Sequence, residues 1–529
     1  MAHFIFITGG VVSSLGKGIT AASIGRLLIS RGLRIRMLKM DPYLNVDPGS
    51  MSPDQHGEVY VTDDGALADL DLGHYERFTG QPTTRQSSVS SGRIYWDVLQ
   101  KERRGEYRGH TVQMIPHITD EIKASIRALA APDVDVVLTE IGGTVGDIEG
   151  LPFLEAIRQI GLEEGRERVL YIHMTYLPLI RAAGELKTKP SQQSVAKLRE
   201  IGIVPDVLVC RSEQPLTQDI RRKLSLFCNV PLHAVIEELD VRHTIHEVPL
   251  VLAEQGLDEI ILVHFRLPRP PAQLADWRAM VAAITQPRGT VRIGVVGQRA
   301  ELPDTHKSLH EALRHGGGAH QQSVEIIPLP AGDFTAGKAP ARLPEINALL
   351  IPDGGDADDL AGRLAAVRHA RETGLPFLGI GRGFHCAVIE YARHVCGLTE
   401  ANDTDTAPDT PHPVVHAAPH GEQLGAKPCA LKPDSLLAKI YGATRISERH
   451  RHALELNPAY RPQLEAAGMV CSGTDPTGHD VQAIELPAHP WFVAVLFHPE
   501  WKSQALHPHP LFRDLIRAAI HHRSHHPPA

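Results

Sequence analysis

Residues 5–22 read Ile-Phe-Ile-Thr-Gly-Gly-Val-Val-Ser-Ser-Leu-Gly-Lys-Gly-Ile-Thr-Ala-Ala, and this stretch decides the fold of the first half of the chain. A short apolar run ends at two glycines, and helix-forming residues resume after Gly16-Lys17-Gly18. This order of strand, loop and helix is typical of a phosphate-binding loop. Glycine lets backbone N–H groups approach a phosphate, while the helix dipole and the Lys17 ammonium add positive charge. The stretch therefore predicts a nucleotide site in an α/β domain.

The loop departs from the usual phosphate-binding pattern in two ways. Five residues rather than four separate Gly10 from Gly16, and Gly18 stands where a hydroxyl side chain ordinarily binds Mg²⁺. A tight strand-to-helix turn without a ligand is the alternative interpretation of such a loop. Its place at the start of an α/β pattern favours nucleotide binding.

Length, charge and cysteine content limit the class of protein. A chain of 529 residues is long enough for two or more domains with substantial cores. The net charge of −8 argues against non-specific nucleic-acid binding. We find no apolar run long enough to cross a bilayer and no signal-peptide pattern. The six cysteines are scattered without paired spacing, so we expect reduced thiols in a cytoplasmic protein.

Two acidic residues are candidates for binding a hard cation. Residues 45–78 are polar and contain glycine, as in a surface loop, but Asp71 is flanked by leucines. Residues 134–140 read as a buried parallel strand that ends at Glu140. Ligands bind at the carboxyl ends of such strands, so Glu140 should face the phosphate loop. We predict Asp71 and Glu140 as Mg²⁺ ligands; two solvated acids are the alternative.

Several long motifs resemble the signatures of the CTP synthase family, and the likeness extends almost without gaps to about residue 265. These motifs are Ser13-Ser14-Leu15-Gly16-Lys17-Gly18, Lys39-Met40-Asp41-Pro42-Tyr43, Asp71-Leu72-Gly73-His74-Tyr75-Glu76-Arg77-Phe78, Glu140-Ile141-Gly142-Gly143-Thr144-Val145-Gly146-Asp147-Ile148-Glu149 and Lys187-Thr188-Lys189-Pro190. The resemblance implies an α/β protein with a P-loop-type, doubly wound synthetase domain over residues 1–266. A linker over 267–289 and a second α/β domain of the class I glutamine amidotransferase type over 290–529 would follow.

The resemblance also implies the substrates and their binding residues. ATP would be bound by Ser14, Leu15, Gly16, Lys17, Gly18, Ile19, Arg211, Asp240 and Val241. UTP, or CTP as an inhibitor, would be bound by Ser13, Asp147, Ile148, Glu149, Lys187, Thr188, Lys189, Pro190, Ser191, Gln192 and Lys223. Lys17 and Lys39 would be catalytic, and Pro53, His56 and Val59 would line an amine passage. The family implies a homotetramer whose nucleotide site is built from more than one chain.

The implied chemistry agrees with these residue types. The C4 oxygen of a uracil ring is a poor leaving group, so ATP first phosphorylates it and an amine then displaces phosphate. Phosphoryl transfer depends on positioning and on neutralising the negative charge that spreads in the transition state. Lysines and Mg²⁺ supply that neutralisation. Read alone, Lys187, Lys189 and Lys223 would be a solvated basic face.

The second domain is expected to carry a damaged glutaminase site. Strands are predicted over 290–297, 323–329 and 348–352. Residues 376–385 align with a nucleophile elbow that in the family reads Gly-Ile-Cys-Leu-Gly-Met-Gln, and Gly381 takes the place of the cysteine. His498 and Glu500 remain. A helix is predicted over 386–395, and its Cys386 is expected to be a core thiol; a relocated nucleophile is the alternative.

Further departures affect glutamine binding. The oxyanion loop, Pro-Gly-Gly-Phe-Gly in the family, here reads Pro352-Asp353-Gly354-Gly355-Asp356. Asp405 and Ala453 replace a glutamate and an arginine that contact glutamine, and residues 411–431 lack part of the lid through which GTP acts. We therefore predict an ATP-dependent C–N ligase that aminates UTP with ammonia or another small amine, without glutamine hydrolysis. The alternative is a non-catalytic nucleotide-binding or regulatory subunit that assembles with an active CTP synthase.

Overall fold

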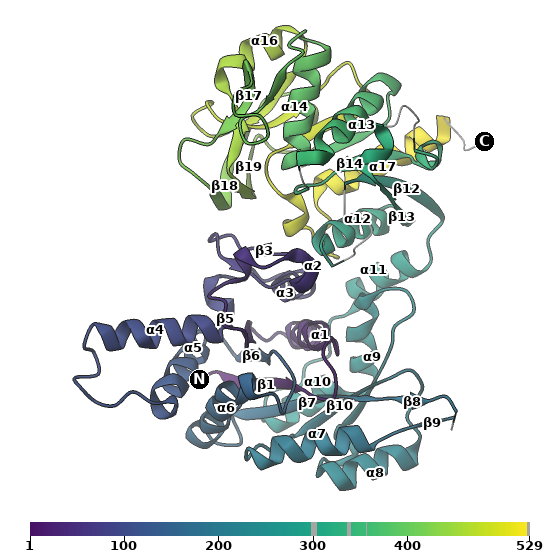
Figure 1. The fold of residues 1–529 in the computed structure, drawn as a ribbon. Helices are drawn as coiled ribbons and strands as arrows, with labels where there is room; N and C mark the ends of the chain where they lie inside the picture. The colour runs from purple at the N-terminus through teal and green to yellow at the C-terminus, as the bar shows by residue number, and fades with distance from the viewer. Residues whose placement is uncertain (183, 298–303, 336–339, 356, 526–529) are drawn as a thin grey trace. The chain divides into compact units, whose positions relative to one another are not determined.

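The computed structural model describes residues 1–525 except 183, 298–303, 336–339 and 356, and the chain folds into two compact units (Figure 1). The first unit comprises Met1–Ser50 and Ala68–Val281, and the second comprises Met51–Leu67 and Ala282–Ala529. The segment Met51–Leu67 thus belongs with the second unit, although the sequence on both sides of it belongs with the first. No helix among the described residues is both long and apolar enough to cross a membrane.

In the described residues, the first unit contains a seven-stranded parallel sheet. Its strands, from edge to edge, are β11 (Val235–Leu239), β10 (Val207–Ser212), β7 (Val169–Leu177), β1 (His3–Gly9), β6 (Val136–Ile141), β2 (Ile35–Asp41) and β5 (Ser88–Ser90). The chain moves one way across the sheet from β1 to β2 and the other way from β6 to β7. Because such crossovers are right-handed, the connecting helices cover opposite faces, and the order reverses between β1 and β6.

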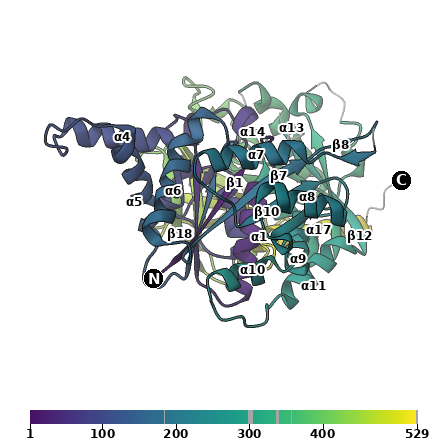
Figure 2. The same ribbon diagram turned by 90° about the horizontal axis from the view of Figure 1, so that it is seen from below.

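Helices cover both faces of this sheet (Figure 2). The connection from β1 to β2 is α1 (Lys17–Ser30), and the connection from β6 to β7 is α6 (Leu151–Glu164). The other helices of the unit are α3 (Asp71–Thr79), α4 (Ser91–Arg103), α5 (Thr119–Ala128), α7 (Lys189–Glu200), α8 (Gln218–Cys228), α9 (Val248–Glu254) and α10 (Leu257–His264). The doubly wound α/β fold predicted for the first half is confirmed.

The expectation of a surface loop over residues 45–78 is wrong in its last part. Asp71 begins α3, whose following residues are buried, and α3 packs against α1. The buried face includes Leu72, Tyr75 and Phe78, which follow helical spacing. The polar composition of the stretch conceals this face because buried Glu76 and Arg77 lie on the same helix.

The second unit contains, in the part of the chain that is described, a nine-stranded mixed sheet. Its strands are, in order, β13 (Gln322–Leu329), β12 (Gly289–Val296), β14 (Ala348–Ile351), β15 (Phe377–Ile380), β23 (Phe492–Val495), β22 (Val481–Glu485), β21 (Val470–Thr474), β18 (Gln423–Leu431) and β19 (Arg445–His452). A smaller sheet joins β16 (Ala401–Asp403), β17 (His412–Ala417) and β20 (Leu454–Leu456). The strands predicted here each agree with the structure to within two residues.

Helices of the second unit pack on its large sheet in two apolar clusters. They are α12 (Lys307–Ala319), α13 (Leu360–Thr373), α14 (Arg382–His394), α15 (Leu436–Tyr441), α16 (Arg461–Ala466) and α17 (Pro510–His525). The helix predicted over 386–395 begins earlier, because the turn after β15 leads directly into α14. The preceding helix α11 (Ala275–Thr285) carries buried Trp277.

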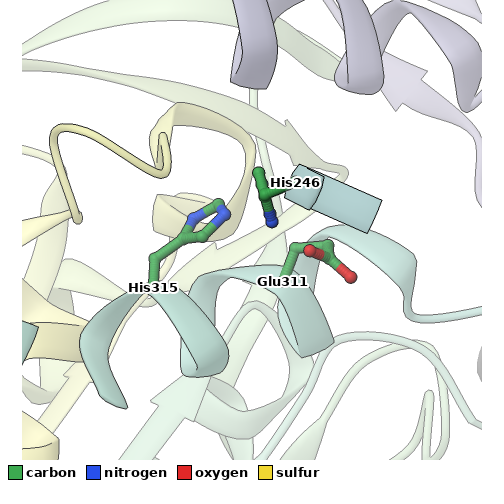
Figure 3. Close-up of side chains that lie close together, drawn as sticks. All are labelled: His246, Glu311 and His315. Carbon is green, nitrogen blue, oxygen red and sulfur yellow. The ribbon is translucent and has the colours of Figure 1, made fainter. Parts of the chain in front are cut away.

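Helix α12 makes one polar contact with the segment that follows β23. Figure 3 shows Glu311 and His315 on one side of this helix; His246, also drawn, belongs to the first unit. The Nδ1 atom of His315 lies 3.0 Å from Oγ of Ser503, and Arg314 donates a hydrogen bond to Glu311. The His315 contact places the helix beside the turn that carries His498 and Glu500, whereas the Arg314–Glu311 bond lies within the helix itself.

A buried arginine holds the segment Met51–Leu67 in the second unit. Arg449, on β19, is 2% exposed and donates hydrogen bonds to Asp63 Oδ1 at 2.5 Å and to Tyr60 Oη at 2.7 Å. Tyr60, on β3 (Tyr60–Val61), donates to the carbonyl of Trp501 at 2.9 Å, and the Trp501 indole donates to Glu58 at 2.8 Å. These bonds join residues far apart in sequence, so the segment folds with the second unit.

We expect Arg449→Met to destabilise the second unit by about 2–4 kcal/mol, because the Asp63 carboxylate and the Tyr60 hydroxyl lose their buried partner. Thermal unfolding should show a lower midpoint, and limited proteolysis should cut within residues 51–67 faster than in the unchanged protein. Arg445→Met on the same strand is the matched control, because Arg445 is exposed and has no ion pair among the described residues. Equal proteolysis of the two variants would contradict this role for Arg449.

Candidate functional site

The loop between β1 and α1 has the conformation of an anion cradle. Val11, Ser14 and Gly16 have positive φ values of 82°, 54° and 92°, so the backbone turns sharply before the helix. Helix α1 begins at Lys17, and no side chain of the described residues caps it. Its first N–H groups therefore lack side-chain partners and, with the helix dipole, favour a negatively charged ligand. This geometry agrees with the phosphate loop predicted from the sequence.

Gly18 has a structural explanation that the sequence did not provide. A Cβ atom at Gly18 would lie 1.9 Å from Oδ1 of Asp71, so only glycine leaves room for this carboxylate. The Asp71 carboxylate therefore occupies the space in which a hydroxyl side chain of the usual pattern would lie. The departure at Gly18 and the acid at Asp71 belong to one arrangement.

Lys39 joins the two predicted metal ligands. Its ammonium donates a hydrogen bond to Oε1 of Glu140 at 2.9 Å and another to Asp71, and it lies 3.7 Å from Oδ1 of Asp41. The strand register explains the first contact, because Lys39 on β2 is paired with Glu140 on β6. Glu140 is 1% exposed, so it is not a solvated acid.

The charges of this group depend on one another. Burial raises the pKa of Glu140, and Lys39 opposes that rise. For Lys39, burial alone would lower the pKa, but Asp71, Glu140 and Asp41 outweigh it and raise the pKa well above its usual value. Burial would raise the pKa of Asp71, but Lys39 and His74 lower it. The group therefore holds a largely buried lysine cation among carboxylates, of which Asp71 is partly exposed.

This donor set fits a hard divalent cation. Carboxylate oxygens are the ligands that Mg²⁺ prefers, and the Lys39 ammonium already shows that Asp71 and Glu140 converge on a cation. Two further residues support this group: Tyr75 donates a hydrogen bond to the Glu140 carboxylate, and Asp69 accepts one from the backbone N–H of Asp71 at 3.0 Å. The sequence analysis assigned neither residue a role in the site, although Tyr75 lies one helical turn after Asp71 in the 71–78 motif and could have been found there.

Lys17 connects the phosphate loop to the next strand end. Its ammonium donates to the carbonyl of Gly143 at 2.9 Å, and burial lowers its pKa. Gly143 follows β6 and precedes the predicted pyrimidine residues Asp147, Ile148 and Glu149, which are exposed. Lys17 thus lies between the phosphate loop and this segment.

The predicted adenine-side residues are brought together. Arg211, at the end of β10, pairs with Asp240 at 2.8 Å and donates to the carbonyl of Leu15 at 3.0 Å. Val241 follows Asp240 and is partly exposed. Parallel strands β10 and β11 end beside the phosphate loop, which explains why residues so distant in sequence meet there.

The other predicted pyrimidine residues fall into exposed and buried groups. Ser13 and Lys189 are exposed, while Lys187 pairs with Glu185, whose charge Lys223 also faces. Thr188 is buried and accepts a hydrogen bond from Gln192. Pro190 is in the first turn of α7. Ser191 is buried and its hydroxyl bonds with Thr175 and the Tyr176 carbonyl, so it faces the protein interior.

The second unit has a nucleophile elbow without a nucleophile. Gly381 lies between β15 and α14 with φ 54° and ψ −109°, the sharp turn that such an elbow requires. His498 Nδ1 lies 2.8 Å from Glu500 Oε1, and the imidazole stacks on Trp501 with ring centroids 4.1 Å apart. Cys386 is fully buried in the core and burial raises its thiol pKa. It is therefore a core thiol, as expected.

A cavity of about 160 Å³ lies within the second unit, beside His498 and the altered oxyanion loop. It is lined by Pro53, Glu58, Val59, Thr305, His306, Leu309, Pro352, Asp353, Gly354, Gly355, Arg363, Arg451, His498, Glu500 and Trp501. Two of the three predicted passage residues are among them, and His56 is not. Asp356, the last residue of the altered oxyanion loop, lies outside the described residues. Ala453 is exposed, and the Asp405 amide donates to Asp403.

Known proteins match both units. The family described as CTP synthase N-terminus matches residues 3–267, and the family described as glutamine amidotransferase class I matches residues 301–518. A curated CTP synthase of Moorella thermoacetica is 53% identical over 98% of both chains. The chain belongs to the CTP synthase family. A CTP synthase of Desulfitobacterium hafniense is 50% identical over 99% of this chain and 100% of its own.

Solved structures are also similar to part of this CTP synthase family member. One of them is the glutaminase domain of a Trypanosoma brucei CTPS with bound acivicin, 31% identical over 44% of this chain and 94% of its own, with a TM-score of 0.41. The predicted membership of the CTP synthase family and the two-part α/β fold are confirmed. The roles assigned to individual site residues remain predictions.

Proposed function

We propose that this chain is an ATP-dependent C–N ligase that converts UTP to CTP, or to an N4-modified analogue, using free ammonia or another small amine. Glutamine is not its nitrogen donor. The observation that carries this proposal is the buried group of Lys39, Asp71 and Glu140 beside a phosphate loop, in a chain whose nucleophile elbow carries Gly381. One half thus has groups suited to phosphoryl transfer, and the other lacks the sulfur that would open an amide.

ATP would bind along the segment from Ser14 to Ile19, with its adenine end near Arg211, Asp240 and Val241. Asp71 and Glu140 would hold Mg²⁺, which supplies charge neutralisation at the phosphates when bound. Lys17 and Lys39 would neutralise the charge that spreads over the transferred phosphoryl group. The short contacts among these side chains support this assignment because they fix the groups before substrate arrives.

UTP would bind at Ser13, at the 147–149 segment and at the basic residues around α7 and α8. Phosphorylation of its C4 oxygen converts a poor leaving group into phosphate, and attack by the amine nitrogen at C4 then releases phosphate. The overall balance is ATP, UTP and ammonia giving ADP, phosphate and CTP. CTP would compete for the same site. The Lys187 and Lys223 side chains, which share Glu185, have spare charge for a triphosphate.

The amine would come from solution and pass Pro53, His56 and Val59. Gly381 offers no nucleophile, and Cys386 is buried in the core. We also propose the homotetramer and the domain limits of 1–266, 267–289 and 290–529 given by the family resemblance. These limits place Met51–Leu67 within the first domain in sequence, although the segment packs with the second unit.

Product analysis tests the nitrogen source directly. The purified chain is supplied with UTP, ATP and Mg²⁺ together with ammonium chloride, methylamine, hydroxylamine or hydrazine, and products are identified by mass. We expect product with at least one of these amines and none with glutamine. Glutamine-driven product would contradict the proposal. Binding of UTP or CTP without product from any amine would support a non-catalytic subunit instead.

A further inference from the structure

The side chain of Asp353 occupies the space of the missing nucleophile. Asp353 follows β14 by two residues, in the altered oxyanion loop. A Cβ atom built on Gly381 would lie 2.5 Å from Oδ1 of Asp353, 2.7 Å from its Cγ and 2.8 Å from its Cβ. These distances are too short for any side chain at position 381. Gly381 and Asp353 are therefore mutually dependent, in the way that Gly18 and Asp71 are.

The same carboxylate takes the hydrogen bond that an oxyanion would need. The Arg382 amide donates to Oδ1 of Asp353 at 2.8 Å. In a nucleophile elbow, the N–H of the residue after the nucleophile stabilises the oxyanion of the tetrahedral intermediate. The donor at Arg382 is thus already used by a permanent negative charge of the protein.

The other carboxylate oxygen faces the remaining histidine. Oδ2 of Asp353 lies 3.9 Å from Nε2 of His498, and that nitrogen has no hydrogen-bond partner among the described residues. Burial would lower the pKa of His498, but Glu500 and Asp353 raise it. Burial would likewise raise the pKa of Asp353, but His498 and backbone N–H groups lower it. Asp353 therefore stands opposite His498 as the anion, where an active thiolate would otherwise stand.

A buried arginine fixes the loop that carries Asp353. Arg363, on α13, is 3% exposed and donates to the Gly354 carbonyl at 2.5 Å. Gly354 and Gly355 have positive φ values of 85° and 98°, and a Cβ at Gly355 would lie 2.0 Å from the guanidinium of Arg363. The loop thus has a conformation that only glycine adopts readily, and the buried Arg363 side chain fixes it by a hydrogen bond. Its geometry directs Asp353 toward the elbow.

We propose that Asp353 is a specificity-determining residue that excludes glutamine as nitrogen donor. It does so by accepting the hydrogen bond of the oxyanion donor and by occupying the space of the nucleophile in the elbow. This inference rests on the proposed function, in which the amine arrives free. It adds a second block that is independent of the missing sulfur. Restoring cysteine at position 381 alone therefore leaves the site closed, and Asp353 must also be removed to open it.

Thiol reactivity provides the test. Iodoacetamide alkylation at position 381 is followed by peptide mass mapping in G381C, in G381C/D353G and in the matched control G381C/D333G, where Asp333 is exposed. We expect the introduced thiol to react at least about tenfold faster in G381C/D353G, because each pKa unit changes the thiolate fraction about tenfold. The control should react as slowly as G381C. Equal rates in all three variants would overturn the proposal.

Two further measurements keep the result interpretable. Ammonia-driven product formation in each variant reports on the fold and on the proposed function, since loss of product in the unchanged protein would refute that function without changing the alkylation comparison. If G381C does not fold, D353G alone is used, and the His498 titration is followed by NMR with labelled histidine and an H498Q assignment variant. We expect a lower His498 pKa in D353G. An unchanged value would overturn the proposal.

Discussion

Replacement of Glu140 by glutamine is expected to reduce ammonia-driven CTP formation by about 10²–10³-fold. Glu140 is 1% exposed, lies 2.9 Å from the Lys39 ammonium and accepts a hydrogen bond from Tyr75. The amide keeps the size of the side chain and removes its charge, so the cation site proposed for Glu140 and Asp71 loses one of its two carboxylates. We expect kcat/KM to fall and the Mg²⁺ concentration needed for half-maximal rate to rise.

Glu155→Gln is the matched control for this change. Glu155 lies on α6 in the same unit and bonds with Arg158 and Gln159 on the surface, away from the phosphate loop. Initial rates with ammonium chloride at several Mg²⁺ concentrations should be unchanged in this variant. A Glu140→Gln variant with the Mg²⁺ dependence and rate of the unchanged protein would exclude Glu140 as a metal ligand.

Replacement of Gly18 by alanine is expected to lower kcat/KM for the ammonia reaction by about 10²-fold, because misplacement of reacting groups by about 1 Å has effects of that size. The new Cβ would lie 1.9 Å from Oδ1 of Asp71, so this carboxylate has to move away from Lys39. Gly18 has an ordinary helical backbone, so alanine would by itself favour the helix by up to about 1 kcal/mol. We therefore expect the alanine variant to lose activity although its helix α1 becomes slightly more stable.

Measuring both kcat/KM and thermal stability therefore separates a displaced Asp71 from general destabilisation. Gly332→Ala is the control, because Gly332 lies in the second unit and has no positive φ, and a Cβ added to it would have no atom of the described residues within 4 Å. It should keep full activity. A Gly18→Ala variant that is more stable and equally active would show that Asp71 is not constrained by the start of α1.

The group formed by Lys39, Asp71 and Glu140 shows what tertiary structure adds to a sequence pattern. The placement of Glu140 at a strand end was predictable, because parallel strands deliver their last residues to one edge of a sheet. Asp71 was a candidate because leucines flank it in a stretch that otherwise reads as a surface loop, and its place beside Glu140 depends on the packing of α3 against α1. The bridging position of Lys39 depends on the register of β2 with β6, which the local sequence does not encode.

The elbow that carries Gly381 shows the same division between sequence and tertiary structure. The sequence identified Gly381, His498 and Glu500, and it recorded Asp353 only as one of several departures from the oxyanion loop. The contact between Asp353 and the Arg382 amide depends on two glycines with positive φ and on the buried Arg363 that bonds with their loop. Similarly, Met51–Leu67 packs with the second unit because Arg449, far along the chain, binds Asp63 and Tyr60.

The sequence by itself determined the strand, phosphate loop and helix at the start of the chain, the family, and the absence of sulfur at position 381. Those features depend on residue type and on spacing within short segments, where local backbone preference and apolar periodicity are sufficient. Only the tertiary structure decided which charges meet: Lys39 with Asp71 and Glu140, and Asp353 with His498. Such pairings depend on strand register, on helix packing and on the exclusion of water, and these are set by contacts between distant segments.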